Sequence, residues 1–212
     1  MLSAALFDID GTLVNTAALI REAVTQVLQE EGIVSTPEEI TAGLSLRAAD
    51  RMRRWARSEG HAEALAARYV ERYLVLHDAL VRPYPGMEET LETLSRRGIS
   101  MGVVTSKRRE PALRTLGAFG LGRFFRIVVC EEDVALPKPD PGPLLLAAAR
   151  LGVAPDETVM IGDAATDIRA GRNAGMETVG AWWGTVEPDA LRAAKPTWLL
   201  AQPADLLSLF GA

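Results

Sequence analysis

Two aspartates near the N-terminus have the spacing that acid/base chemistry needs. Asp8 and Asp10 end an apolar stretch that predicts a strand over residues 4–9, and Gly11 follows as a turn residue. Alternate residues of a strand point to the same side, so both carboxylates are expected to face one site while Ile9 packs. One carboxylate can attack as a nucleophile while the other gives and later takes a proton.

Three further polar segments end predicted strands or lie in the loops after them. Residues 104–107 read VTSK, residues 136–139 read LPKP, and residues 162–167 read GDAATD. Ligands gather at the carboxyl ends of parallel strands, so these segments are expected to converge on residues 8–12. Carboxylates massed at one edge repel one another unless a cation neutralises them, and oxygen ligands favour Mg²⁺. The sequence therefore predicts a magnesium site that serves phosphoryl transfer.

Several side chains in these segments suit the binding of a phosphate group. The ammonium group of Lys138 can offset charge between an attacking carboxylate and the phosphate. Thr105, with Ser106 beside it, can donate a hydroxyl hydrogen to a phosphate oxygen. Gly11 can let backbone N–H groups approach the same anion.

A doubly wound α/β core is predicted to position these residues. Helical runs alternate with short apolar strands after residue 84, which is the pattern of right-handed βαβ units and a parallel sheet covered on both faces. The predicted strands are residues 99–106, 126–130, 158–163 and 176–182. The predicted helices are residues 87–98, 110–120, 141–152, 166–175 and 203–210.

An all-helical cap is predicted as an insertion after the first strand. Residues 17–79 carry helical periodicity without a strand signal, and Thr36 with Glu39 resembles a capping box. Two longer helices are expected at residues 46–58 and 62–80. The predicted domains are a core of residues 1–14 and 84–212 and a cap with its linkers at 15–83, with RPYPG at 82–86 as the hinge.

Composition bounds the function and the compartment. The net charge of -5 argues against a general nucleic-acid binder, which needs basic patches. No apolar stretch approaches the length of about 20 residues that crosses a membrane, so no membrane partner is expected. Cys130 is the single cysteine, which excludes an internal disulfide and suits a reducing cytoplasm. A small phosphorylated metabolite is the expected partner, and the oligomeric state stays open.

Taken in order, the motifs DIDGT, VVTSK, Lys138-Pro139-Asp140 and GDAATD resemble the haloacid dehalogenase superfamily, in its phosphatase branch with a helical cap. This resemblance implies a Mg²⁺-dependent phosphatase that forms an aspartyl phosphate. It implies Asp8 as the nucleophile, Asp10 as general acid and then base, Thr105 as a phosphate ligand and Lys138 as the residue that balances charge.

The same resemblance implies the metal ligands. The direct ligands would be Asp8, the backbone carbonyl of Asp10, and Asp163. Asp167 would act through a water molecule or by contacting the direct ligands. One departure is Asn15, where many members of the superfamily carry a second aspartate after DGTLV. That position faces the cap in the superfamily, so the change bears on substrate contacts or on the hinge.

The core motifs predict the reaction better than the substrate. Within the superfamily the chain most resembles phosphoglycolate phosphatases and related phosphatases that act on inorganic pyrophosphate, and phosphoglycolate is the first expectation. A pyrophosphatase and a phosphomutase on the same scaffold are the enzyme alternatives. A phosphate-binding regulatory module is the alternative outside enzymes, although the complete set of Asp8, Asp10, Lys138 and Asp163 argues against it.

Other chemically distinctive residues are expected to be structural. The arginines between Arg51 and Arg57 predict a solvated helix face, and the run from Lys107 to Arg109 predicts an exposed helix start. His61 and His77 are expected at the surface. Cys130, Trp182 and Trp183 are expected to pack against other apolar side chains.

Overall fold

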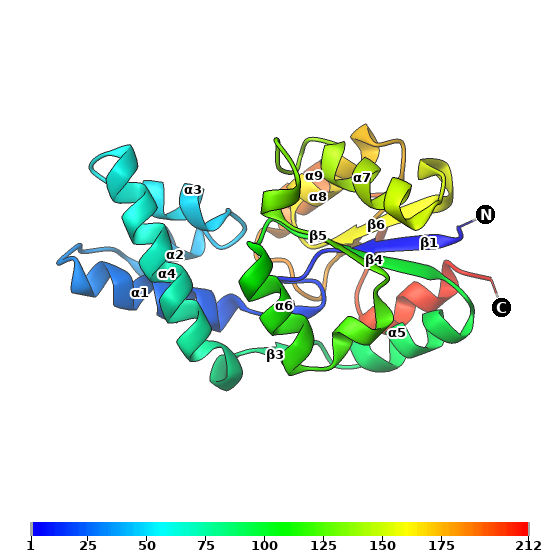
Figure 1. The fold of residues 1–212 in the computed structure, drawn as a ribbon, viewed down its shortest axis with the longest axis horizontal. Coiled ribbons are helices and arrows are strands. Elements are labelled where there is room, and N and C mark those ends of the chain that lie inside the picture. Colours follow the sequence, from blue (N-terminus) through cyan, green and yellow to red (C-terminus); the bar gives the residue numbers. More distant parts are fainter. Residues whose placement is uncertain (1, 212) are drawn as a thin grey trace. The chain divides into compact units, whose positions relative to one another are not determined.

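The computed structural model describes residues 2–211 (Figure 1). The chain forms two compact units. One contains the described residues up to Asn15 together with those from Pro83 onward, and the other is Thr16–Arg82. The expected boundaries at 14 and 84 each lie one residue from those of the structure.

The larger unit is built on one six-stranded sheet. Its strands are β1 (Ala4–Phe7), β4 (Ser100–Val104), β5 (Ile127–Val129), β6 (Thr158–Gly162), β7 (Glu177–Ala181) and β8 (Trp198–Leu200). Their order is β5-β4-β1-β6-β7-β8, and every neighbouring pair is parallel. After β1 the chain builds one side of the sheet through β4 and β5, then returns to build the other side from β6. Such a reversal of strand order places a crevice at the carboxyl end of β1.

Helices cover both faces of this sheet (Figure 1). On one face α7 (Gly142–Leu151) and α8 (Ala165–Asn173) pack on the strands through buried Leu6, Met160 and Leu144. On the other side lie α5 (Met87–Arg96) and α6 (Arg109–Ala118). Because apolar side chains of the strands are buried on both sides, the sheet excludes water and only its edges and ends stay accessible. The predicted doubly wound α/β fold is confirmed.

Several predicted elements differ in extent from those of the structure. The first strand ends at Phe7, and the closing segment forms a 3₁₀-helix at Pro203–Ser208 where an α-helix was expected. Further 3₁₀-helices occupy Leu121–Phe124, Glu131–Asp133 and Pro155–Glu157. Two elements were not predicted, α9 (Pro188–Ala193) and β8, which are short and follow the last predicted strand.

The smaller unit is helical, as expected. It contains α1 (Ala17–Glu30), α2 (Pro37–Thr41), α3 (Ala48–Arg53) and α4 (Glu59–Leu80). The capping box before α2 is confirmed, because the hydroxyl of Thr36 accepts a hydrogen bond from the Glu39 N–H at 3.2 Å and Glu39 accepts one from the Thr36 N–H at 2.8 Å. The helix expected at 46–58 is only six residues long.

Two polar side chains of this unit are buried against expectation. Arg51 is 4% exposed, and its guanidinium donates to the carbonyl oxygens of Gly43, Leu44 and Leu46. His77 is fully buried, and its Nδ1 lies 2.9 Å from Oδ1 of Asp78. The sequence shows where basic residues cluster, but it does not show which of them tertiary packing will bury. This burial was therefore not predicted.

Two short strands connect the units. They are β2 (Val14–Asn15) and β3 (Arg82–Pro83), which pair with each other. The backbone N–H of Tyr84 also donates to the carbonyl of Leu13 at 3.1 Å. The hinge expected at 82–86 therefore includes a paired segment. Within residues 2–211 no helix has both the length and the apolar character to cross a membrane.

Candidate active site

Strand register brings three predicted site residues to one edge of the sheet. Phe7 pairs with Val103 of β4 and with Ile161 of β6. Asp8 is the next residue after Phe7, and its N–H donates to the Ile161 carbonyl at 3.0 Å. Thr105 follows the last residue of β4 and Asp163 follows the last residue of β6. The three residues are therefore positioned by neighbouring parallel strands.

The loop after β1 is shaped by Gly11. Its φ of 76° lies in the left-handed region that favours glycine, and a side chain at this position would collide with the carboxylate of Asp163. The N–H of Gly11 donates to the carbonyl of Val14 at 2.9 Å. Gly11 was expected to help bring N–H groups to a phosphate. The structure shows its role in the turn and in the close approach of Asp163, and the expected role toward phosphate remains a prediction.

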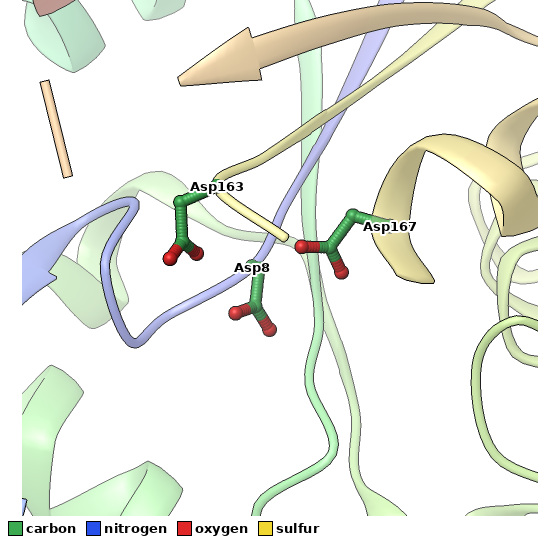
Figure 2. A group of neighbouring side chains, drawn as sticks. All are labelled: Asp8, Asp163 and Asp167. Carbon is green, nitrogen blue, oxygen red and sulfur yellow. The ribbon is translucent and has the colours of Figure 1, made fainter. Parts of the chain in front are cut away.

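Three carboxylates gather where this loop meets the ends of the strands. Figure 2 shows Asp8 on the loop after β1, Asp163 after β6 and Asp167 in the first turn of α8. One oxygen of each lies within 4.8 Å of the others, so the group could hold a metal ion. Asp10 is outside this group of side chains. Its expected contribution to the metal was its backbone carbonyl, and that assignment remains a prediction.

Lys138 lies among these carboxylates. Its Nζ is 2.6 Å from Oδ1 of Asp167, 3.0 Å from Oδ1 of Asp8 and 3.0 Å from the carbonyl oxygen of Val104. The other oxygen of Asp167 accepts a hydrogen bond from the Ala164 N–H at 3.1 Å, which fixes the carboxylate at the start of α8. Asp167 thereby holds the lysine in place, and the lysine orients Asp8.

One ammonium among three buried carboxylates leaves an excess of negative charge. Burial raises the pKa of Asp8 to about 6, against the opposing effect of Lys138. Burial and the charges of Asp167 and Asp8 hold the pKa of Asp163 well above its ordinary value. Burial would lower the pKa of Lys138, but Asp167 and Asp8 outweigh it and raise that pKa. A hard cation with oxygen ligands would relieve this excess, so the residues fit the predicted Mg²⁺.

Asp10 and Lys107 form a second pair in the same region. The Nζ of Lys107 lies 3.0 Å from Oδ1 of Asp10, and the Lys107 side chain is 10% exposed. Lys107 was expected in an exposed helix start, and this expectation was wrong for Lys107 alone. The backbone N–H of Lys107 donates to the hydroxyl oxygen of Thr105 at 3.2 Å, which turns the chain inward before α6 begins. Arg108 and Arg109 are exposed as expected.

Other contacts near the loop were not predicted. The hydroxyl of Thr12 donates to Oδ1 of Asp163 at 3.3 Å, and the indole N–H of Trp183 donates to the carbonyl of Thr12 at 3.0 Å. Burial raises the pKa of Tyr84, and the charges of Asp163 and Asp10 raise it further. Trp183 was expected only in packing, because no sequence pattern marks an indole that bonds to a distant loop.

The remaining predicted residues take simpler positions. Ser106 is partly buried and follows Thr105 in the loop after β4. Cys130 is buried, as expected of a small core residue. Burial raises the pKa of its thiol to about 11, so it has little thiolate character. Trp182 packs against the buried cluster of Ile168, Leu191 and Ala194.

The sequence model of the haloacid dehalogenase-like hydrolases matches residues 5–181, which include all the carboxylates and both lysines of this site. The chain belongs to this family. The predicted superfamily is thereby confirmed.

This haloacid dehalogenase-like hydrolase has relatives similar over almost their whole length. It is 35% identical over 221 residues to the pyrophosphatase PpaX of Bacillus velezensis, covering 99% of this chain and 96% of that protein. The crystal structure of a candidate phosphoglycolate phosphatase from Lactobacillus plantarum has a TM-score of 0.91 and 27% identity, covering 99% of this chain and 100% of that one. The predicted enzyme class, a phosphatase of this family, agrees with both names.

A third similarity is to a structure with a bound phosphorylated sugar. CbbY from Rhodobacter sphaeroides, in complex with xylulose 1,5-bisphosphate, has a TM-score of 0.83 and 25% identity. The similarity covers 97% of this chain and 96% of CbbY. The same architecture therefore occurs in a protein that binds a small phosphorylated sugar.

Proposed function

We propose that this hydrolase is a Mg²⁺-dependent phosphatase that acts through a phosphorylated Asp8. The observation that carries the proposal is the convergence of Asp8, Asp163 and Asp167 around Lys138 at the carboxyl ends of β1 and β6. A buried carboxylate beside a lysine, in a group with excess negative charge, suits a nucleophile that works with a cation.

In the first step, a carboxylate oxygen of Asp8 attacks phosphorus and the bond to the leaving oxygen breaks. Lys138, at 3.0 Å from Oδ1 of Asp8, holds the nucleophile in place and offsets the charge of the incoming phosphate. Thr105 is buried at the end of β4, where its hydroxyl can donate to a phosphate oxygen. Mg²⁺ would be held by Asp8, Asp163 and the backbone carbonyl of Asp10, with Asp167 behind them, and would supply positive charge to the phosphoryl group.

Asp10 would carry the proton in both steps. Its carboxyl group gives a proton to the leaving oxygen as the aspartyl phosphate forms. It then takes a proton from the water that attacks phosphorus, which releases inorganic phosphate and restores Asp8. The Asp10 side chain is 26% exposed, more than that of Asp8, so it can reach a substrate and a water molecule.

The proposed substrate is a small phosphorylated compound, with inorganic pyrophosphate as the first candidate. The relatives named pyrophosphatase PpaX support this choice, because the one from Bacillus velezensis is 35% identical across 99% of this chain. Phosphoglycolate, the first expectation from the sequence, is the second candidate, and the TM-score of 0.91 to a candidate phosphoglycolate phosphatase supports it. Both compounds have small, anionic leaving groups.

The test measures phosphate release from pyrophosphate, phosphoglycolate and a panel of other small phosphate esters, with Mg²⁺ and with EDTA. We expect turnover that EDTA abolishes and a loss of about 10³-fold or more in Asp8→Asn, which keeps the shape of the side chain but not its nucleophilicity. The matched control is Asp156→Asn, at an exposed aspartate outside the site. More than a tenth of wild-type activity in Asp8→Asn would overturn the proposal.

The helical unit is proposed to favour small substrates. It joins the chain directly after the loop that bears Asp8 and Asp10, and the chain returns from it through β3, which pairs with β2. Replacing residues 18–80 with a short Gly/Ser linker should retain slow hydrolysis of an aryl phosphate. It should also reduce the preference for small substrates, which we expect at about 10²-fold in kcat/KM in the full chain. Full preference in the deletion variant would show that the helical unit is not the selector.

A further inference from the structure

Lys107 is held from four directions. Its Nζ lies 3.0 Å from Oδ1 of Asp10 and 3.2 Å from the hydroxyl oxygen of Thr115, a fully buried residue of α6. Its backbone N–H donates to the hydroxyl oxygen of Thr105 at 3.2 Å, and its carbonyl accepts from the N–H of Glu131 at 3.0 Å. Two of these contacts hold the ammonium group and two hold the backbone, so both the loop and the charged end of the side chain are fixed.

Asp10, by contrast, has little support from secondary structure. Strand β1 ends at Phe7, and Asp10 lies in the loop with an isolated bridge to Val14. A carboxylate on such a loop has several rotamers, and a proton donor must be held within hydrogen-bond reach of the leaving oxygen. The contact with Lys107 is therefore a specific restraint on where this carboxylate lies.

We propose that Lys107, supported by Thr115, is a positioning residue that holds the Asp10 carboxylate for proton transfer. The inference rests on the proposed function, in which Asp10 is the acid and base. Lys107 contacts Oδ1 of Asp10, and the second carboxylate oxygen can carry the proton. The contact of the Lys107 backbone with Thr105 places the phosphate-binding residue and the restraint on Asp10 in one loop.

Leaving-group chemistry gives the first test. Phosphoryl transfer from 2-phosphoglycolate needs a proton on its alkoxide, whereas p-nitrophenyl phosphate releases a stable phenolate without one. With enzyme in excess and rapid quenching, Lys107→Met should slow the single-turnover rate for 2-phosphoglycolate by about 10- to 10²-fold, because misplacement by about 1 Å can cost that much. The rate for p-nitrophenyl phosphate should change less than about threefold.

Arg108→Met is the matched control. It removes the same charge one residue later, but Arg108 is 61% exposed and pairs with Glu132. A general loss of attraction for anionic substrates would slow both variants and both substrates alike. Thr115→Val keeps the volume and charge while removing the hydroxyl that supports Lys107. It should slow 2-phosphoglycolate by a smaller factor, about threefold to tenfold, again with p-nitrophenyl phosphate spared.

A double-mutant cycle decides whether Lys107 acts through Asp10. We expect Lys107→Met to cause no further loss in an Asp10→Asn background, because the restrained group can no longer transfer the proton. An undiminished second loss, or equal slowing of the two substrates, would overturn the positioning role and indicate direct contact with substrate. The parent proposal is tested separately, because activity retained in Asp8→Asn would overturn it whatever the Lys107 variants do.

Discussion

Arg51 in the helical unit and Lys138 in the core are both buried cations, and their partners differ. Arg51 donates to three neutral backbone carbonyls, and its guanidinium lies 5.0 Å from the ring centroid of Tyr69. Lys138 contacts the carboxylates of Asp8 and Asp167, with Asp163 close by. The first arrangement satisfies the donors of one cation, whereas the second concentrates more negative charge than one cation can neutralise.

The comparison distinguishes a buried charge that stabilises the fold from a group of buried charges that serves a functional site. The guanidinium of Arg51 donates to three backbone carbonyls of the irregular segment before α3 and so holds this segment together. Burial and the neighbouring carboxylates raise the pKa of Asp8 and of Asp163, so both groups oppose folding when ionised unless a further cation joins them. The helical unit should therefore lose stability when the charge of Arg51 is removed, while the core should gain stability and lose activity when one of its buried carboxylates is neutralised.

Arg51→Met should produce the largest loss of stability. It removes a donor from three carbonyls, and hydrogen bonds to charged groups contribute about 1.5–3 kcal/mol each before relaxation, so we expect a loss of about 3–4 kcal/mol. Urea unfolding followed by circular dichroism would measure it. Arg53→Met, at a side chain 49% exposed, should leave stability nearly unchanged. Equal effects of the two substitutions would contradict this assignment.

Asp163→Asn should show the opposite sign in the metal-free protein. The amide keeps the acceptor for Thr12 and removes one charge from the buried group, so stability in EDTA at pH 7.5 should rise by about 2 kcal/mol. Activity should fall or require much more Mg²⁺. Thermal unfolding of the wild type, Asp163→Asn and the exposed control Asp156→Asn would measure the change. A clear loss of stability in Asp163→Asn would show that this carboxylate supports the fold.

The stability of the metal-free protein should also depend on pH with a defined sign. The pKa of Asp8 rises from 3.8 to about 6 on folding, so between these values the folded state holds the proton more tightly. The stability that protonated Asp8 contributes is fully present below pH 3.8 and is lost as pH rises through 6. Each tenfold difference in proton affinity between the folded and unfolded states corresponds to about 1.4 kcal/mol. The raised pKa of Asp163 acts in the same direction.

Added Mg²⁺ reverses this loss, since it binds the ionised carboxylates. The increase in Tm on adding Mg²⁺ should therefore be larger at pH 7.5 than at pH 5, and the stabilisation by Asp163→Asn should shrink at pH 5. Differential scanning fluorimetry at the two pH values would measure both. The same increase at both pH values would contradict a site whose carboxylates must ionise to bind the ion.

The regular part of the fold could be predicted from the sequence because its signals are local. Alternation of apolar strands and amphipathic helices indicated the parallel sheet, and Thr36 and Glu39 indicated the start of α2. Short elements such as α9 and β8 carry too few residues for periodicity to mark them. Their place is set by packing on β7 and α8, which a sequence pattern does not show.

The candidate site was predictable where its residues follow strands. Asp8, Thr105 and Asp163 could be placed because parallel strands end at a common edge. Lys107 was missed because its run of three basic residues suggests an exposed segment, and a turn fixed by Thr105 buries it. Trp183 was missed because its bond crosses 171 residues to Thr12. The sequence shows that a residue is charged or aromatic, but only its tertiary contacts show which loop it supports.

Trp183→Phe should give the smallest effect, and it tests directly whether the bond to Thr12 supports the catalytic loop. The ring remains but the donor to the Thr12 carbonyl is lost, which should cost about 1 kcal/mol in stability. Thr12 also bonds Asp163 and follows Gly11, so a looser loop should lower kcat about threefold with little change in KM. Trp182→Phe is the matched control, because its ring packs on the cluster of α8 and α9 and should change stability alone. If Trp182→Phe lowers kcat as much as Trp183→Phe, the effect comes from general packing, and the bond to Thr12 does not hold the catalytic loop.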